Sequence, residues 1–332
     1  MAEDVITING TEYLTEHLED QFSRPLLFQS TPTRQINSPE VSWQTFWQFM
    51  RDDPQKDVDV YDYSISEEDK RTEKRSVKSI IEHWGKEPRT ALKCLDIENR
   101  MSCCCPSAII QYDLLQRTAR HWETTVGKAG SRWSNLHKEF LLLSTKDCIS
   151  PIHVDVGAAL TWLYVIHGRK IVYFPRIINL DVVHLLARLG GEQFHGYKGG
   201  WIRVELRPGD LFIMTPSCPH AVFTPDDPLV VSSHFYTSAH LPSTLEGLSL
   251  LEKYQNISNE SLEDHHYRTL AQILNSYDRV ATLEEVKRAW VTYHVFLDSS
   301  RKSKLSNGRA EFIAALRDFD KRAAESFSNE PE

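Results

Sequence analysis

Between residues 140 and 231 the chain is divided into short apolar segments, and this pattern limits the possible folds more than any other feature. Turn signals such as Gly168-Arg169 and Pro208-Gly209-Asp210 separate the segments. The segments are residues 140–144, 160–166, 170–174, 201–206, 211–214, 220–223 and 229–231. Many short strands at close spacing predict an antiparallel sandwich or barrel.

The sequence on both sides of this region has the periodicity of helices. Trp43, Phe46, Trp47 and Met50 share one helix face, and a similar stripe returns after about residue 255. The charged stretch 67–78 mixes both signs, which favours a solvated turn and the start of a helix.

These patterns predict a mainly β chain, a β-barrel framed by helices on both sequence flanks. We expect residues 1–100 to form mixed elements that support the barrel. The barrel itself should span residues 101–255, and residues 256–332 should form a C-terminal helical region.

The charge balance limits the partners of the chain. Lys and Arg number 38 against 46 Asp and Glu, a net charge of −8, which argues against direct binding of nucleic-acid phosphates and suits a cationic partner. The first residues lack a secretory signal, and no apolar run approaches the about 20 residues that span a bilayer. We therefore expect no membrane association.

The six cysteines predict neither a zinc finger nor a disulfide framework. None of them forms a C-x-x-C pair, and the absence of a secretory signal favours a reducing compartment. The adjacent trio Cys103, Cys104 and Cys105 is expected to consist of small buried or half-buried residues.

The triplet His153-Val154-Asp155 is the first candidate for chemistry. On a strand, residues i and i+2 point to the same face, so the imidazole and the carboxylate would both enter the barrel. A third ligand, His220, follows the turn at Pro208-Gly209-Asp210 on a later strand. Two histidines and one carboxylate on one face of an octahedral metal form the facial triad of non-haem Fe(II) oxygenases.

A His-x-acid triplet alone is weakly specific. His17-Leu18-Glu19, His121-Trp122-Glu123 and His137-Lys138-Glu139 fit the same template, in polar or helical surroundings that indicate surface residues. An apolar strand before His153 and the distal His220 distinguish the first triplet. Triplet and context alone remain compatible with a structural histidine as well as with a metal site.

Two segments resemble the JmjC histone lysine demethylases, closest to the branch whose larger members carry PHD or CXXC modules. Residues 138–157, KEFLLLSTKDCISPIHVDVG, resemble the iron-binding strand, and residues 209–225, GDLFIMTPSCPHAVFTP, resemble the distal-histidine segment. Trp162 and the turn at residues 168–171 have the spacing of this branch. Weaker similarity at 24–28, 58–62 and 92–98 extends the resemblance over roughly residues 24–250.

The resemblance implies a cupin-like double-stranded β-helix and a complete set of site residues. Fe(II) would be held by His153, Asp155 and His220, with 2-oxoglutarate and dioxygen as co-substrates. Lys170 would pair with the distal carboxylate of 2-oxoglutarate. Ser150 stands where the family usually has threonine, and its hydroxyl would donate the same hydrogen bond.

The chain departs from the family at three positions around the co-substrate. Leu163 occupies the position of a tyrosine that hydrogen-bonds 2-oxoglutarate, and Lys93 and His234 each replace an expected asparagine. The iron set is therefore intact, whereas its surroundings, with His234 among the expected co-substrate residues, are altered.

The resemblance implies a dioxygenase that hydroxylates a C–H bond. On an N-methyl group the product would collapse to formaldehyde and demethylated lysine, so a protein substrate, in particular a histone tail, is expected. The alternatives are a hydroxylase acting on a protein side chain or small molecule, and a catalytically weak JmjC binding or scaffold protein. By family analogy the protein would be a nuclear chromatin regulator, and a cytoplasmic location stays open.

Overall fold

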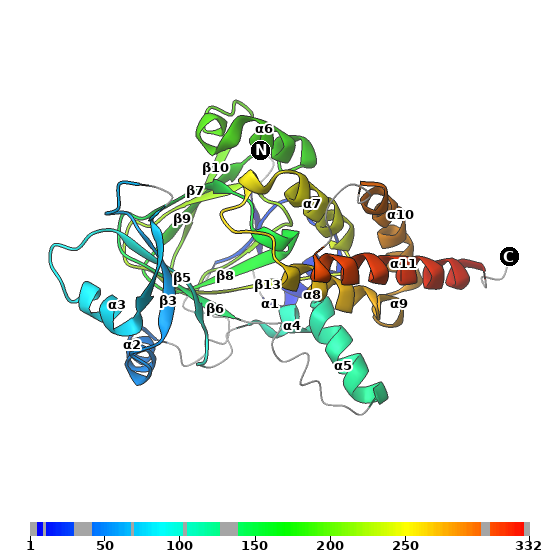
Figure 1. The fold of residues 1–332 in the computed structure, drawn as a ribbon, viewed down its shortest axis with the longest axis horizontal. Coiled ribbons are helices and arrows are strands. Elements are labelled where there is room, and N and C mark those ends of the chain that lie inside the picture. The colour runs from blue at the N-terminus through cyan, green and yellow to red at the C-terminus, as the bar shows by residue number, and fades with distance from the viewer. Residues whose placement is uncertain are drawn as a thin grey trace.

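Two β-sheets form the centre of the molecule (Figure 1). The computed structural model describes residues 5–8, 11–29, 42–67, 70–101, 105–126, 139–299 and 306–328. The larger sheet has nine strands, in the order β1 (Ile6–Ile8), β2 (Leu26–Phe28), β11 (Leu211–Met214), β8 (Leu160–His167), β13 (Leu229–Phe235), β6 (Phe140–Ser144), β5 (Leu92–Glu98), β3 (Asp57–Asp62) and β4 (Thr72–Ser76). The smaller has the order β10 (Trp201–Leu206), β9 (Lys170–Pro175), β12 (His220–Phe223) and β7 (Ile149–His153).

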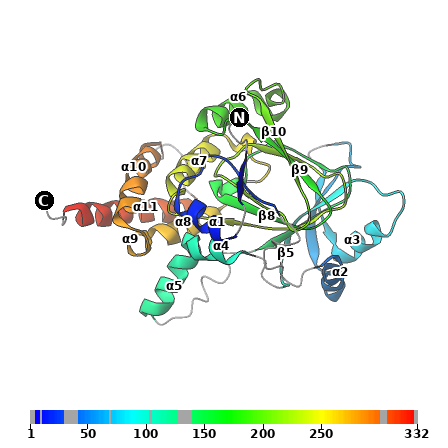
Figure 2. The same cartoon turned by 180° about the vertical axis from the view of Figure 1, so that it is seen from behind.

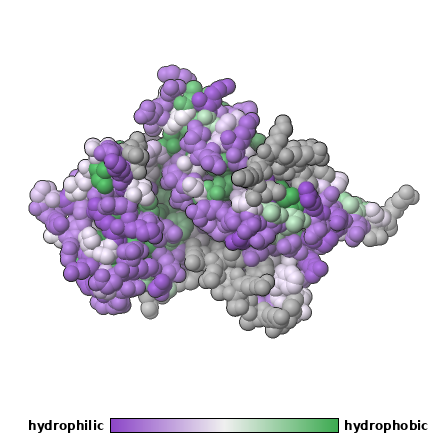
Figure 3. All heavy atoms as spheres, in the orientation of Figure 1, coloured by the Kyte–Doolittle hydropathy of each residue, from purple (hydrophilic) through white to green (hydrophobic). Residues whose placement is uncertain are grey.

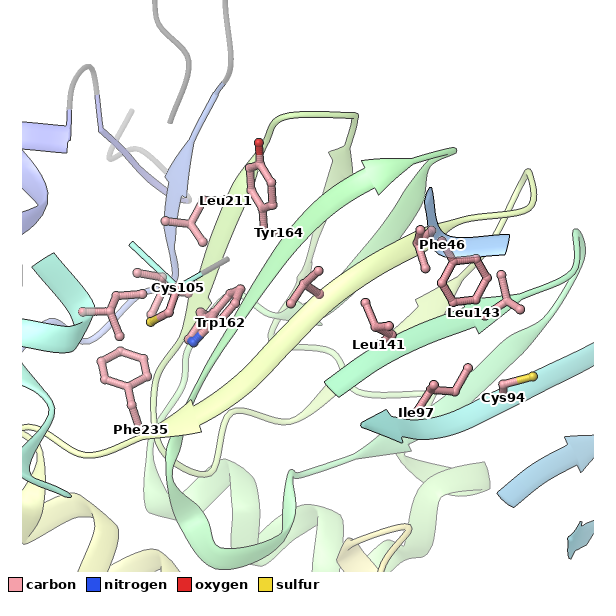
Figure 4. Close-up of a cluster of buried hydrophobic side chains, with 14 of the residues drawn as sticks. Phe46, Cys94, Ile97, Cys105, Leu141, Leu143, Trp162, Tyr164, Leu211 and Phe235 are labelled. Atoms are coloured by element: carbon pink, nitrogen blue, oxygen red, sulfur yellow. The ribbon is translucent and has the colours of Figure 1, made fainter. Parts of the chain in front are cut away.

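Period-two alternation along β8 sends its side chains to two different cores. Leu163 and Val165 pack between the two sheets, with Val172 of β9 and Val222 of β12. Trp162 points to the opposite face, into a second cluster with Leu211 and Phe235 (Figure 4). The space between the sheets therefore receives every second residue of each strand, and this alternation selects the side chains that can form an internal site.

Four helices cover the outer face of the larger sheet. They are α1 (Thr11–Glu19), α2 (Trp43–Asp52), α3 (Val77–Trp84) and α4 (Ser107–Tyr112). Each contributes buried side chains to the cluster of Figure 4, where Phe46 of α2 is labelled. The hydroxyl of Ser42 accepts a hydrogen bond from the backbone N–H of Thr45 and caps the start of α2.

Most of the remaining helices form a second packed unit at one end of the sheets, opposite α2 and α3 (Figure 2). This unit contains α5 (Leu114–Val126), α7 (Leu241–Lys253), α8 (Asp264–Leu274), α9 (Tyr277–Val280), α10 (Leu283–Ser299) and α11 (Asn307–Ser328). Tyr277, Phe312 and Phe319 are fully buried in it. Helix α6 (Leu180–Phe194) is separate, and its backbone breaks at Gly190, where φ is 74°.

The strands expected in the middle of the chain are present, and helix α6 is inserted between β9 and β10. The expectation of a mainly β chain holds for this middle region only, because the described residues as a whole mix helix and sheet. The two large sheets are compatible with a jelly-roll. The three-part division of the chain stays a prediction, although β1 to β5 pair within the same sheet as β6, β8, β11 and β13.

The expectation for the charged stretch 67–78 is wrong in part. Residues 72–76 form strand β4, which pairs with β3, and helix α3 begins only at Val77. Strand β4 lies at the edge of the sheet, where charged side chains face water and discourage pairing with another chain. The charges therefore mark an edge strand here, and not a turn.

Cys94, Cys105, Cys148 and Cys218 are buried free thiols, whereas Cys103 and Cys104 lie outside the described residues. None of the helices in the described ranges combines the length and apolar character needed to cross a bilayer. On the face shown in Figure 3, hydrophilic side chains cover most of the surface and hydrophobic ones form small patches between them.

Candidate active site

Strands β7 and β12 bring two histidines together across the smaller sheet. His153, the last residue of β7, is the register partner of His220, the first residue of β12. Their ring centroids are 4.4 Å apart, although 66 residues separate them in sequence. Both side chains are buried, with 8% and 4% of their surface exposed. The antiparallel pairing of the two strands therefore creates the histidine pair.

Asp155 completes the cluster from a turn. Strand β7 ends at His153, and Asp155 precedes the short 3-10 helix η2 (Val156–Ala158), so the expectation that both residues lie on one strand is only half correct. Its Oδ1 atom is 3.8 Å from Nε2 of His153 and 3.7 Å from Nε2 of His220. One ligand atom from each residue lies within 4.8 Å of the others.

The second nitrogen of each histidine is already used. Nδ1 of His153 lies 2.7 Å from the carbonyl of Pro151, and Nδ1 of His220 lies 3.0 Å from the carbonyl of Cys218. A carbonyl can only accept, so each Nδ1 donates a proton to it and each Nε2 is left directed at Asp155. Donation from the second ring nitrogen to a carbonyl is the usual support for a metal-binding histidine, and these three residues fit a divalent metal.

Thr161 links Asp155 to His234. Its hydroxyl donates to Oδ2 of Asp155 at 2.6 Å, which leaves Oδ1 directed at the histidines. Because the hydroxyl has a single proton, it accepts from Nδ1 of His234, 3.0 Å away on the neighbouring strand β13. His234 was expected among the co-substrate residues, which stays a prediction, and in the structure it contacts Thr161. Sequence reasoning missed Thr161, whose inward position could be read from its spacing to Leu163.

The pKa shifts of His153 and Asp155 favour the binding of a cation by the cluster. Burial, assisted by the neighbouring His220, lowers the pKa of His153, so this imidazole is neutral at physiological pH. Burial alone would raise the pKa of Asp155, but the two histidines and His234 outweigh it and lower the pKa. An ionised carboxylate beside a neutral imidazole is the protonation state that metal binding requires.

Lys170 lies on the same sheet, on the first residue of β9. Its side chain is 4% exposed, and none of the described residues hydrogen-bonds or ion-pairs with it. Burial, together with the charge of Lys93, lowers its pKa from 10.5 to about 7. A shift of this size corresponds to about 5 kcal/mol of destabilisation of the ammonium form. An anion that enters the space between the sheets would remove this penalty.

Lys93 and Ser150 connect the two sheets. Nζ of Lys93, on β5 of the larger sheet, donates to Oγ of Ser150, on β7 of the smaller sheet, at 2.8 Å. Burial lowers the pKa of Lys93 as well. Leu163 is 5% exposed and belongs to the apolar core between the sheets, so it offers no donor. The structure thus brings the expected co-substrate residues Ser150 and Lys170 into the same interior as Lys93.

Two segments hold the turn that carries Asp155. The backbone N–H of Val154 donates to the carbonyl of Ile257 at 2.8 Å, in the 3-10 helix η3 (Gln255–Ile257). Helix α7 packs on η2 at Gly247, where an added Cβ would lie 2.8 Å from Cβ of Ala158. The ligand geometry therefore depends on elements that lie outside both sheets.

The other candidate triplets and a cavity between the helices lie elsewhere. His17 and His121 are on the helices α1 and α5, and His137 lies outside the described residues. A cavity of about 830 Å³ between α1, α5 and α10 is lined by charged groups such as Arg117 and Glu285 and by none of the expected site residues.

Comparison with known proteins agrees with the site. Lysine-specific demethylase 2A of Xenopus tropicalis is 30% identical over 121 residues, which are 35% of this chain and 11% of that protein. Lysine-specific demethylase 2B of Mus musculus is 26% identical over 179 residues, 51% of this chain and 13% of that protein. JmjC domain-containing histone demethylation protein 1 of Saccharomyces cerevisiae is 29% identical over 152 residues, which are 42% of this chain and 31% of that protein. No protein-family model matches the chain.

The chain is related to the JmjC histone lysine demethylases. Its match spans less than a third of the length of each of these three relatives, so it corresponds to a limited part of them. The relationship implies a JmjC oxygenase family with a cupin-like fold and, through that family, dependence on Fe(II) and 2-oxoglutarate. The cluster of His153, Asp155 and His220 supplies the ligand set that such chemistry needs.

Proposed function

We propose that the chain is an Fe(II)- and 2-oxoglutarate-dependent dioxygenase built on a double-stranded β-helix. One observation carries the proposal, namely that Nε2 of His153, Nε2 of His220 and Oδ1 of Asp155 converge inside the β-structure. A set of two histidines and one carboxylate leaves open positions for a bidentate 2-oxo acid and for dioxygen.

Each residue of the site has a role in this proposal. His153, Asp155 and His220 would hold Fe(II), with Thr161 fixing the carboxylate. Lys170 would bind the distal carboxylate of 2-oxoglutarate, which offsets its buried charge. Bound iron supplies the activation of dioxygen, for which 2-oxoglutarate provides two electrons as it becomes succinate and carbon dioxide. The apolar core around Leu163 would exclude water from the reacting groups.

The proposed substrate is a methylated lysine on a histone or another protein. Three relatives are named as lysine or histone demethylases, and the net charge of −8 suits a basic peptide. Hydroxylation of one N-methyl C–H bond gives a hemiaminal, which loses formaldehyde and leaves an N–H bond. By the same analogy we propose a nuclear location and a role in chromatin regulation.

Two other outcomes remain open. The same chemistry on a protein side chain or small molecule would give a stable hydroxylated product. Leu163 favours a third outcome, a weakly catalytic binding or scaffold protein, because an alkyl group replaces a donor to the co-substrate. Each outcome has a separate product signature.

The decisive experiment incubates the purified protein with Fe(II), ascorbate, 2-oxoglutarate and histone peptides that carry mono-, di- or trimethyl-lysine. We expect succinate, formaldehyde and a loss of about 14 Da from one peptide by mass spectrometry. Asp155→Ala should lose both activity and bound iron because it removes the anionic ligand. The matched control Asp59→Ala, which changes an exposed carboxylate on β3, should retain both.

Other products would change a specific part of the proposal, either the substrate, the reaction or the enzymatic activity itself. Succinate without any change in methylated peptides would exclude these histone substrates and leave the oxygenase in place. A gain of about 16 Da on another protein or metabolite would identify a hydroxylase. No succinate with any substrate, together with normal iron content, would favour the scaffold protein.

A further inference from the structure

Lys93 points into the site because of the alternation of β5. Its neighbours Leu92 and Cys94 are both fully buried in the cluster on the outer face of the larger sheet. Lys93 therefore faces the opposite way, toward the smaller sheet, where its ammonium group binds the hydroxyl of Ser150. An apolar or neutral side chain would be the ordinary occupant of such a position, so a lysine here requires an explanation.

The register of the smaller sheet places Lys93 between the histidines and Lys170. Along β12, His220 pairs with His153, and Val222 pairs with Ser150 on one side and with Val172 on the other. Lys170 lies two residues beyond Val172 on the same face of β9, about 7 Å further along the strands. Lys93 and Ser150 therefore lie between Lys170 and the cluster of His153, Asp155 and His220, and closer to that cluster than Lys170 does.

The charges around Lys93 agree with this position. After burial, the main influence on its pKa is attraction to Glu260, with smaller effects of Cys148 and Asp155. In turn, Lys93 lowers the pKa of Lys170 and of His153. The thiol of Cys148 has a raised pKa and is uncharged at neutral pH, so it does not offset the repulsion between the two ammonium groups.

We propose that Lys93 is a second cationic binding residue of the co-substrate site, beside the 2-oxo carboxylate, while Lys170 binds the distal carboxylate. The inference rests on the proposed function. With Leu163 in place of a phenol, the two lysines and Ser150 supply the donors of the site. Two ammonium groups in separate rows fit a 2-oxo acid with a carboxylate at each end. The lysine thus replaces the lost hydrogen bond by a charge.

The test measures binding without turnover, with Mn(II) in place of Fe(II), by calorimetric titration of 2-oxoglutarate and of 2-oxopentanoate, which lacks the distal carboxylate. Lys93→Met should weaken both ligands at least about tenfold, because both carry the 2-oxo carboxylate. Lys170→Met should weaken only 2-oxoglutarate. Lys146→Met, an exposed lysine in the turn before β7, is the matched control and should change neither affinity.

Two results would overturn the inference. Unchanged affinity for both ligands in Lys93→Met would make Lys93 a structural tie between the sheets. Loss of affinity for 2-oxoglutarate alone would move Lys93 to the distal carboxylate. If the methionine variant fails to fold, Lys93→Gln keeps a donor without the charge and decides the same question. Failure of the wild-type protein to bind either ligand would instead overturn the proposed function.

Discussion

At the residue scale, the buried charge of Lys170 lowers the free energy of unfolding of the protein. Its pKa is about 7 in the folded protein and 10.5 when exposed. The unfolded chain therefore binds more protons between these two values, so stability rises as the pH increases from about 7 toward 10.5. Below pH 7 the penalty is fully present. Residues that lower stability in this way are typical of binding sites.

The same residue should make co-substrate binding depend on pH. Only the ammonium form of Lys170 attracts a carboxylate, so above pH 7 binding must first take up a proton. We expect the affinity for 2-oxoglutarate to be constant below pH 7 and to fall up to about tenfold per unit above it. Titrations between pH 6 and 9 with saturating Mn(II) would measure this change. A similar change near pH 7 in Lys170→Met would show that another group is responsible.

At the level of elements, helix α7 packs against the two turns that carry the proposed metal ligands. Ala158 follows Asp155, and Ser217 precedes His220, and both have positive φ, at 50° and 55°. Left-handed backbone at residues with a side chain is held by its surroundings. Gly247 of α7 lies against both turns, and an added Cβ would contact them. The absence of a side chain at Gly247 therefore permits the ligand geometry.

Gly247→Ala should loosen the site although it changes no ligand. Moving the turn away from Cβ of Ala158 is expected to cost about 1–3 kcal/mol and to weaken metal binding. Thermal unfolding and iron content would report the two effects. Gly85→Ala is the matched control, because its nearest neighbour would be a backbone oxygen at 3.6 Å. If the two variants had the same unfolding temperature and iron content, α7 would have to shift without disturbing the turns.

The sequence predicts elements better than it predicts their partners. The apolar segments 140–144, 201–206 and 211–214 coincide with strands, since period and turn residues are local properties. The pairing of His153 with His220 is set by strand register, which no local pattern specifies. For the same reason Thr161 was missed, because its contacts with Asp155 and with His234 of the neighbouring strand depend on register.

For the molecule as a whole, the region after residue 255 contacts the turn that carries Asp155, a proposed metal ligand. Ile257 accepts the backbone N–H of Val154, between two proposed ligands. His266 at the start of α8 lies so close to Gly157 that an added Cβ would be 2.9 Å from its ring. Tyr236 of the sheet region is buried in the same core as Phe312 and Phe319. The region after residue 255 therefore takes part in building the site.

A chain that ends at residue 255 should consequently fail to bind iron. The truncation leaves the N–H of Val154 without its acceptor and exposes the apolar residues that α7 and α5 bury against α8 and α11. We expect a lower unfolding temperature or aggregation, measured by scanning calorimetry and light scattering, with metal content by elemental analysis. A soluble fragment with full iron content would instead show that residues 256–332 form an independent unit.

Because Lys93 and Lys170 are buried, the lifetime of the polypeptide should depend on the concentration of the 2-oxo acid. A bound 2-oxo acid would neutralise both charges, and a ligand at 100 times its dissociation constant adds about 2.7 kcal/mol to the apparent stability. Proteases in a cell degrade chains in proportion to their unfolded fraction. A shortage of the 2-oxo acid would then reduce the amount of this protein as well as its catalytic rate. Recovery of the protein level would require new synthesis.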